Sequence, residues 1–179
     1  MEVRTMSNSS TATASIVGGR DVAVEPLAIG PDRRLVRKVV SYVVRNGRLL
    51  VFSHDDIPLE VVGVQVPAGT IEDGELPEVA AVREVLEETN LQTHVVRALG
   101  VELYDVWPSK PEIHERHFYQ LATLDEDLKE RWSAGEPSPS GDGPPQRWTC
   151  RWIPLEQAHV LCAGLGARLG HIAPTSTDA

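Results

Sequence analysis

An acid-rich segment of 23 residues constrains this chain more than any other feature of its sequence. Between Gly69 and Leu91 lie seven acidic residues and one basic residue, Arg83, so the segment carries a net charge of −6 out of −9 for the whole chain. Hydrophobic residues recur with helical spacing over Pro77 to Thr89, which predicts a helix with a proline in its first turn. Asn90 tolerates the left-handed conformation that ends many helices, so we expect the helix to stop there.

Three glutamates share one face of this predicted helix. Glu84, Glu87 and Glu88 stand at i, i+3 and i+4, a spacing that brings their carboxylates together. Like charges at this spacing destabilise a helix by roughly a few tenths of a kcal/mol per pair, and the helix dipole disfavours anions near the C-terminus. Stability gives no reason for the arrangement, whereas a divalent cation with oxygen ligands does. A solvated acidic face is the alternative that these three residues alone leave open.

The wider spacing of this segment resembles the Nudix box. That pattern is glycine, five residues, glutamate, seven residues, and then arginine, glutamate, aliphatic, any residue, two glutamates, any residue, glycine and aliphatic. Gly69 and Glu75 occupy its first fixed positions, and the run from Arg83 to Leu91 matches the rest, except that Asn90 replaces the last glycine. The resemblance implies an α/β fold, a Nudix-type α/β/α sandwich with a mixed β-sheet, and hydrolysis of a diphosphate linkage.

The resemblance also implies roles for individual residues of the box. Glu87 and Glu88 would ligate the metal, and the carbonyl of Gly69 would complete the site. Glu84 would be a further ligand or the base beside the attacking water. The metal expected is Mg²⁺, with Mn²⁺ able to substitute, and no organic cofactor is needed.

Other charged residues would support these carboxylates. The resemblance implies that Arg83 orients them, most simply by pairing with Glu75 or Glu84, although a purely local salt bridge is the alternative. Many members of the family supply another acid from outside the box, as base or extra ligand. Glu115 is the favoured candidate here and Glu112 the other, while an exposed, charged strand start explains either residue singly.

Further side chains outside the box could meet a substrate. Basic side chains and histidines that could contact phosphate are Arg37, Lys38, Arg45, His114 and His117. A solvated or hydrogen-bonded surface role explains these residues as well. Alternation along the strand would place His114, Arg116 and Phe118 on one face and Glu115 and His117 on the other. The aromatic residues that we expect in the core, rather than stacked on a base, are Tyr104, Trp107, Trp148 and Trp152.

Strands are expected on both sides of the predicted helix. β-branched or alternating runs cover Arg37–Arg45, Arg48–His54, Val61–Val66, Thr93–Val106, Ile113–Leu124 and Arg147–Ile153. Asn46-Gly47 predicts a tight hairpin between the first two. A second helix is expected over Glu156–Leu169, on the side of the sheet opposite the first helix. The polar stretch Asp125–Gln146 is expected to be a loop, mobile in its second half, that serves as a lid or specificity loop.

Length and charge limit the kind of protein. With 179 residues, the chain fits a single domain over residues 22–172, with a disordered tail at 1–21 and a frayed end at 173–179. The net charge of −9 argues against binding a nucleic acid polymer through its phosphates. Neither a membrane-spanning stretch nor a signal peptide is evident. Cys150 and Cys162 lack metal-ligand spacing, so we expect buried thiols in a cytoplasmic protein.

The identity of the substrate is the least constrained feature. Gln65 to Gly69 resembles the approach to the box among ADP-sugar pyrophosphatases, and Pro108 lies 17 positions past Leu91, near a proline that these enzymes often carry. We therefore expect a small-molecule nucleotide substrate, a nucleoside diphosphate derivative with an ADP-sugar as the favoured example. A catalytically silent nucleotide sensor and an isoprenoid diphosphate isomerase are the alternatives. A homodimer is compatible with the resemblance.

Overall fold

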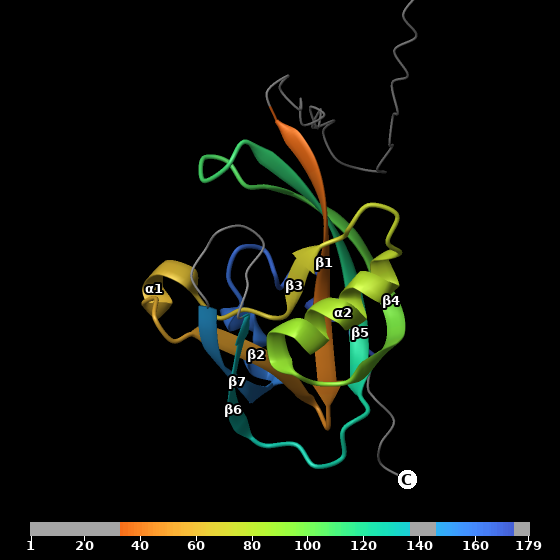
Figure 1. The fold of residues 1–179 in the computed structure, drawn as a ribbon, viewed down its shortest axis with the longest axis vertical. Coiled ribbons are helices and arrows are strands. Elements are labelled where there is room, and N and C mark those ends of the chain that lie inside the picture. The colour runs from red at the N-terminus through yellow and green to blue at the C-terminus, as the bar shows by residue number, and fades with distance from the viewer. Residues whose placement is uncertain (1–32, 137–145, 174–179) are drawn as a thin grey trace, which may run out of the picture. The chain divides into compact units, whose positions relative to one another are not determined.

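The computed structural model describes residues 33–136 and 146–173 of the chain. Their strands form one mixed sheet in the order β4-β5-β1-β2-β7-β6, and β3 pairs with β1 beside this path (Figure 1). The strands are β1 Arg34–Arg45, β2 Arg48–His54, β3 Ala68–Thr70, β4 Thr93–Asp105, β5 Glu112–Thr123, β6 Arg131–Glu136 and β7 Gln146–Pro154. The helices are α1 Leu59–Val62 and α2 Pro77–Thr89, followed by the 3₁₀ turns η1 Leu155–Val160 and η2 Leu169–His171. β1 and β5 are parallel, so the predicted α/β fold with a mixed sheet is confirmed.

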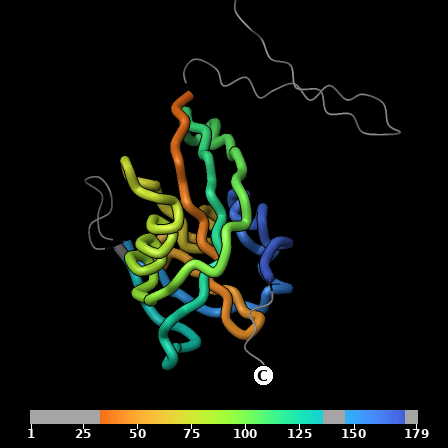
Figure 2. Tube along the Cα trace, turned by 90° about the vertical axis from the view of Figure 1, so that its right-hand side faces the viewer, coloured from red at the N-terminus to blue at the C-terminus, as the bar shows by residue number. Residues whose placement is uncertain are grey.

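The two faces of the sheet pack against different segments. Figure 2 shows the central strands between α2 on one side and the C-terminal segment, residues 155–172, on the other. Alternate residues of β1 serve the two faces, with Val39 and Val43 buried in the cluster under α2 and Val40 and Val44 buried in the cluster under the C-terminal segment. β1 is therefore buried on both faces, and it carries the residues that link them.

Local sequence signals are confirmed where they are strongest. Asn46 and Gly47 have φ angles of 49° and 68° and close the hairpin between β1 and β2. The helix α2 has the predicted bounds, and Asn90 ends it in the left-handed conformation with φ 61° and ψ 20°. Not all of the hydrophobic residues whose spacing predicted the helix are buried, because Val79 and Leu86 are exposed. Its buried residues are Ala80, Ala81, Val85 and Thr89.

The C-terminal helix predicted over Glu156–Leu169 is wrong. The segment instead forms η1, a turn, and η2. Ala163 and Gly164 have φ angles of 51° and 71°, and two successive left-handed residues cannot belong to a right-handed helix. This segment nevertheless covers the sheet, because Ala158 and Leu165 are buried in the same cluster as Val40.

Two further predictions are wrong for local reasons. The strand predicted over Val61–Val66 is not formed, because α1 covers its start and ends at Gly63 with a φ of 68°, and Val64 and Gln65 make only isolated β-bridges. The stretch predicted to be only loop contains β6, which pairs with β7. Trp132 is the only large hydrophobic side chain in β6, so no alternating pattern marked it as a strand.

Several expectations concern residues outside the described ones. The tail at 1–21 and the second half of the polar stretch, residues 137–145, fall there, as does all of 173–179 except Ala173. Cys150 is buried as predicted, whereas Cys162 is only partly buried. Among the described residues, no helix is long and apolar enough to cross a membrane.

Candidate active site

Gly69 in β3 lies directly against Glu84 of α2. A Cβ atom placed on Gly69 would come within 1.8 Å of Glu84 Cδ, so a residue other than glycine would displace this carboxylate. The side chain of Glu84 is 13% exposed. Burial raises the pKa of its carboxyl group, although the hydrogen bond from Arg83 opposes the shift. A buried carboxylate with a raised pKa is suited to accepting a proton.

Arg83 gathers the carboxylates of the acid-rich segment. It donates two parallel hydrogen bonds to Glu75, from Nε and Nη2, each 2.8 Å long. Its Nη1 donates to Glu84 at 2.9 Å and to Glu87 at 3.1 Å, and Nη2 also donates to the carbonyl of Thr70. The bidentate contact holds the pKa of Glu75 at about 2. The pairing of Arg83 with Glu75 and Glu84 was predicted from the sequence, and the pairing with Glu87 was not.

The end of α2 is fixed by contacts that the sequence did not reveal. The backbone N–H of Ala68 donates to the carboxylate of Glu88 at 3.0 Å. The carbonyl oxygens of the last helical residues would otherwise lack partners. The indole N–H of Trp148 donates to Glu88 O at 2.5 Å, and that of Trp132 donates to Thr89 O at 2.8 Å. Two tryptophans from neighbouring strands therefore hold the helical turn that carries Glu87 and Glu88.

The chemistry of this donor set fits a divalent cation. Glu84 and Glu87 both accept from one nitrogen of Arg83, so their oxygens already converge on a positive charge. Glu88 is one residue further along α2, and all three supply the carboxylate oxygens that Mg²⁺ prefers. Within the described part of the chain, no three acidic, histidine or cysteine side chains yet converge as a metal site. Glu84 and Glu87 share the guanidinium of Arg83, whereas Glu88 accepts from the N–H of Ala68 instead.

Glu115 and Glu112 lie on β5 and are engaged elsewhere. Glu115 lies 2.7 Å from His117 and 3.6 Å from Arg37. Glu112 accepts from His114 at 3.1 Å. The choice of Glu115 as the acid from outside the acid-rich segment remains a prediction.

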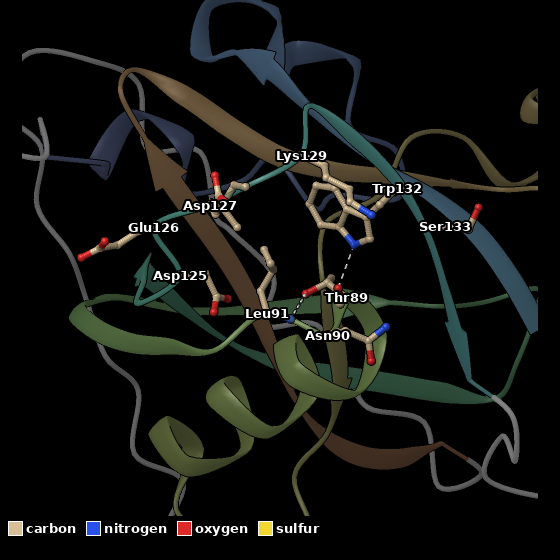
Figure 3. A pocket seen from close by; sticks show the side chains of 10 residues that line it. Thr89, Asn90, Leu91, Asp125, Glu126, Asp127, Lys129, Trp132 and Ser133 are labelled. Carbon is tan, nitrogen blue, oxygen red and sulfur yellow. Dashed lines mark hydrogen bonds between the residues drawn. The ribbon is translucent and has the colours of Figure 1, made fainter.

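A pocket of about 570 Å³ lies beyond the end of α2. Figure 3 shows Trp132 beside Thr89 at the end of α2, with Asp125 and Asp127 of the polar stretch further away. None of the three glutamates on the face of α2 lines this pocket. The first part of the polar stretch, residues 125–133, therefore borders the C-terminal end of α2.

The aromatic residues divide between core and surface. Trp148 and Trp152 are buried in the cluster under α2, as predicted. Trp107 is 60% exposed, so its predicted burial is wrong. It belongs to the turn between β4 and β5, where the guanidinium of Arg33 lies over its ring. Tyr104 is only partly buried and lies beneath the guanidinium of Arg116.

Comparison with known proteins gives consistent results. A family model described as NUDIX domain matches residues 35–174. The RNA pyrophosphohydrolase of Aliivibrio fischeri (strain MJ11) is 34% identical over 104 residues, which cover 52% of this chain and 60% of that protein. The chain thus spans less than two thirds of that relative. The ADP-ribose pyrophosphatase of Bacillus subtilis (strain 168) is 25% identical over 156 residues, 71% of this chain and 84% of that protein.

Solved structures show the same fold. The MutT protein from Methanosarcina mazei Go1 has a TM-score of 0.57 at 14% identity, covering 78% of this chain and 94% of that chain. A NUDIX hydrolase from Nitrosomonas europaea has a TM-score of 0.56 at 18% identity, covering 77% and 87%. At these identities the likeness establishes the architecture alone.

Proposed function

Because this chain belongs to the Nudix family, whose domain spans residues 35–174, we propose that it hydrolyses a diphosphate linkage in a small nucleotide derivative. The observation that carries the proposal is the gathering of Glu84 and Glu87 around Arg83, with Glu84 seated against Gly69. Members of the family generally use divalent metal ions, and converging carboxylates on one helix face supply the oxygen ligands for such an ion.

The residues of the box divide the work between binding and proton transfer. Glu87 and Glu88 would hold Mg²⁺, or Mn²⁺ in its place, together with Glu84 or the carbonyl of Gly69. When bound, the ion neutralises diphosphate oxygens and acidifies a water molecule. The buried carboxylate of Glu84 accepts the proton as the water oxygen bonds to phosphorus and the bridging P–O bond breaks. Two phosphate-bearing fragments leave, and Glu115 is the candidate acid from outside the box.

A nucleoside diphosphate derivative is the substrate class that the similarities favour, with an ADP-sugar as the example. The ADP-ribose pyrophosphatase of Bacillus subtilis aligns with 71% of this chain, whereas the RNA pyrophosphohydrolase of Aliivibrio fischeri aligns with 52%. The net charge of −9 opposes the approach of an RNA backbone. These observations support a small molecule over an RNA 5′ end.

A nucleotide sensor without hydrolysis is the competing function. It would have no need for the carboxylates of the box, yet Glu84, Glu87 and Glu88 are all present. These like charges repel each other and destabilise the helix, so a sensor that bound no metal would be more stable without them. The hydrolase reading therefore accounts for more of the sequence.

The test is turnover of nucleoside diphosphate compounds, ADP-ribose among them, with Mg²⁺, comparing the unmodified protein with Glu87→Gln. We expect hydrolysis that a chelator abolishes and that the variant loses by about 100-fold or more. Glu60→Gln, an exposed change in α1, is the matched control and should leave turnover unchanged. If no compound is hydrolysed while nucleotides still raise the melting temperature, the sensor function replaces this proposal.

A further inference from the structure

A cleft of about 220 Å³ lies on the face of the sheet away from α2. Lys38 of β1 and Arg116 of β5 line it from the sheet, and the C-terminal segment covers it with Cys162 and Ala163. Ala68 also lines it, and this is the residue whose N–H holds Glu88. The cleft therefore opens beside the carboxylates of the box.

Arg116 is a buried cation that lacks an anionic partner among the described residues. It is 8% exposed, and buried charges in proteins are normally paired. Its one side-chain hydrogen bond in this part of the chain runs from Nη1 to the carbonyl of Ala163 at 2.5 Å. Glu102 lies in register with it on β4 but pairs with Arg168 at 2.8 Å. The guanidinium lies 3.8 Å from the ring centroid of Tyr104, which orients it without neutralising it.

A second cation, Lys38, lies in the same cleft as Arg116. Lys38 lies in register with Arg116 on the adjacent parallel strand, a placement of like charges that destabilises a sheet. Burial lowers the pKa of Lys38, with Glu84 opposing and Lys110 and Arg116 adding to the shift. His114, on the same face of β5, also lines the cleft, where burial lowers the pKa of its ring. Lys38 donates a hydrogen bond to Thr70 Oγ1 at 2.7 Å, but its charge still lies beside the like charge of Arg116.

The backbone that covers the cleft is held in an unusual conformation. Ala163 has a φ of 51°, which a residue with a side chain rarely adopts. A Cβ on the next residue, Gly164, would lie 2.9 Å from the ring of Tyr104 and 3.4 Å from Nη1 of Arg116. This turn brings a carbonyl onto Nη1 of the guanidinium, and within residues 33–136 and 146–173 no hydrogen bond engages its other two nitrogens. Strained backbone of this kind is concentrated at ligand sites.

We propose that this cleft is an anion subsite in which Arg116 and Lys38 bind a phosphate or carboxylate group on the moiety beyond the scissile diphosphate. A planar guanidinium matches the two oxygens of either group. The inference rests on the proposed function and narrows it. The substrate class becomes a nucleoside diphosphate joined to a small moiety that carries its own negative charge.

Pairs of substrates that differ by one anionic group test this subsite. ADP-ribose is compared with ADP-ribose 1″-phosphate, and UDP-glucose with UDP-glucuronate, using the full chain with Mg²⁺. We expect kcat/KM to favour the anionic member of one pair by at least about tenfold, and that pair identifies the group as phosphate or carboxylate. Arg116→Gln should remove the preference by raising KM for the anionic member, and Arg116→Lys should restore part of it. Arg147→Gln, an exposed change on β7, is the control and should leave kcat/KM unchanged for both members of each pair.

Binding of inorganic phosphate in the presence of EDTA tests the subsite without catalysis. Calorimetry should show binding that Arg116→Gln weakens by about tenfold and that Glu87→Gln leaves unchanged. If Arg116→Gln affects both members of each pair equally, or leaves phosphate binding intact, the inference is overturned. If no compound is hydrolysed but phosphate binding still depends on Arg116, the subsite stands and the proposed hydrolysis fails.

Discussion

Two arginines on opposite faces of the sheet have opposite surroundings. Arg83 contacts the carboxylates of Glu75, Glu84 and Glu87, and its side chain is 25% exposed. Arg116 is more deeply buried, at 8% exposure, and pairs with no carboxylate among the described residues. The first guanidinium arranges anions that belong to the protein. The second is arranged by the protein, through Tyr104 and a backbone carbonyl, and leaves its charge for another molecule.

The contrast between the two arginines shows that negative charge is concentrated on the α2 side of β1 and positive charge in the cleft on its other side. On one side the acid-rich segment carries excess negative charge, and on the other Lys38 and Arg116 supply positive charge. A diphosphate that bridges the two would meet a metal held by carboxylates at one end and cations at the other. Each of the following changes breaks one half of this division.

The largest effect is expected from Gly69→Ala. The new Cβ would overlap the carboxylate of Glu84, whose Cδ lies within 1.8 Å of that position, so Glu84 must move by an ångström or more. Misplacement on that scale lowers kcat by on the order of 100-fold. Steady-state kinetics on ADP-ribose measure it. Gly170→Ala, where a Cβ meets open space, is the control, and equal rates for both variants would contradict the role of Glu84.

The structure around Arg83 could be predicted from the sequence because the residues that determine it are close together in the chain. The bounds of α2 and the left-handed Asn90 follow from residues within one helix. The contact between Arg83 and Glu75 spans eight residues and follows from the same helix and the turn before it. Charge repulsion within one helix is visible in the sequence, and a cation site was proposed from it.

The surroundings of Arg116 in the cleft could not be predicted, because the residues that form them are far apart in the chain. Alternation along β5 correctly placed Phe118 on the same face as Arg116, and in the structure this face meets the C-terminal segment. What Arg116 meets there was hidden, since Ala163 lies 47 residues away in a segment that we predicted to be helical. The tryptophans that hold the end of α2 were hidden for the same reason, because Trp148 lies 60 residues from Glu88.

A smaller effect is expected on stability, and it separates the two arginines. Arg83→Gln leaves Glu75, Glu84 and Glu87 without their cation. Because these pairs are partly exposed, we expect a loss of about 1 kcal/mol, which lowers the melting temperature by about 2–4 °C in a domain of this size. Arg116→Gln removes a buried charge that has no carboxylate partner in the described residues, so the melting temperature should stay level or rise. Thermal unfolding in EDTA measures both, and an equal decrease would make Arg116 a structural residue.

The smallest effect is expected in how the loss of melting temperature caused by Arg83→Gln depends on pH. The hydrogen bonds from Arg83 lower the pKa of Glu75 from its usual 4.5 to about 2. A carboxyl group whose folded pKa is depressed adds stability above its unfolded value and loses it as the pH falls through its folded value. The contribution of Glu75 to the difference in melting temperature between the unmodified protein and Arg83→Gln should therefore be complete above pH 4.5 and be lost as the pH falls toward 2. The Arg116→Gln difference should show no such step, because no carboxylate in the described residues depends on it. A step of equal size in both variants would mean that Arg116 also holds a carboxylate, and the contrast between the two arginines would fail.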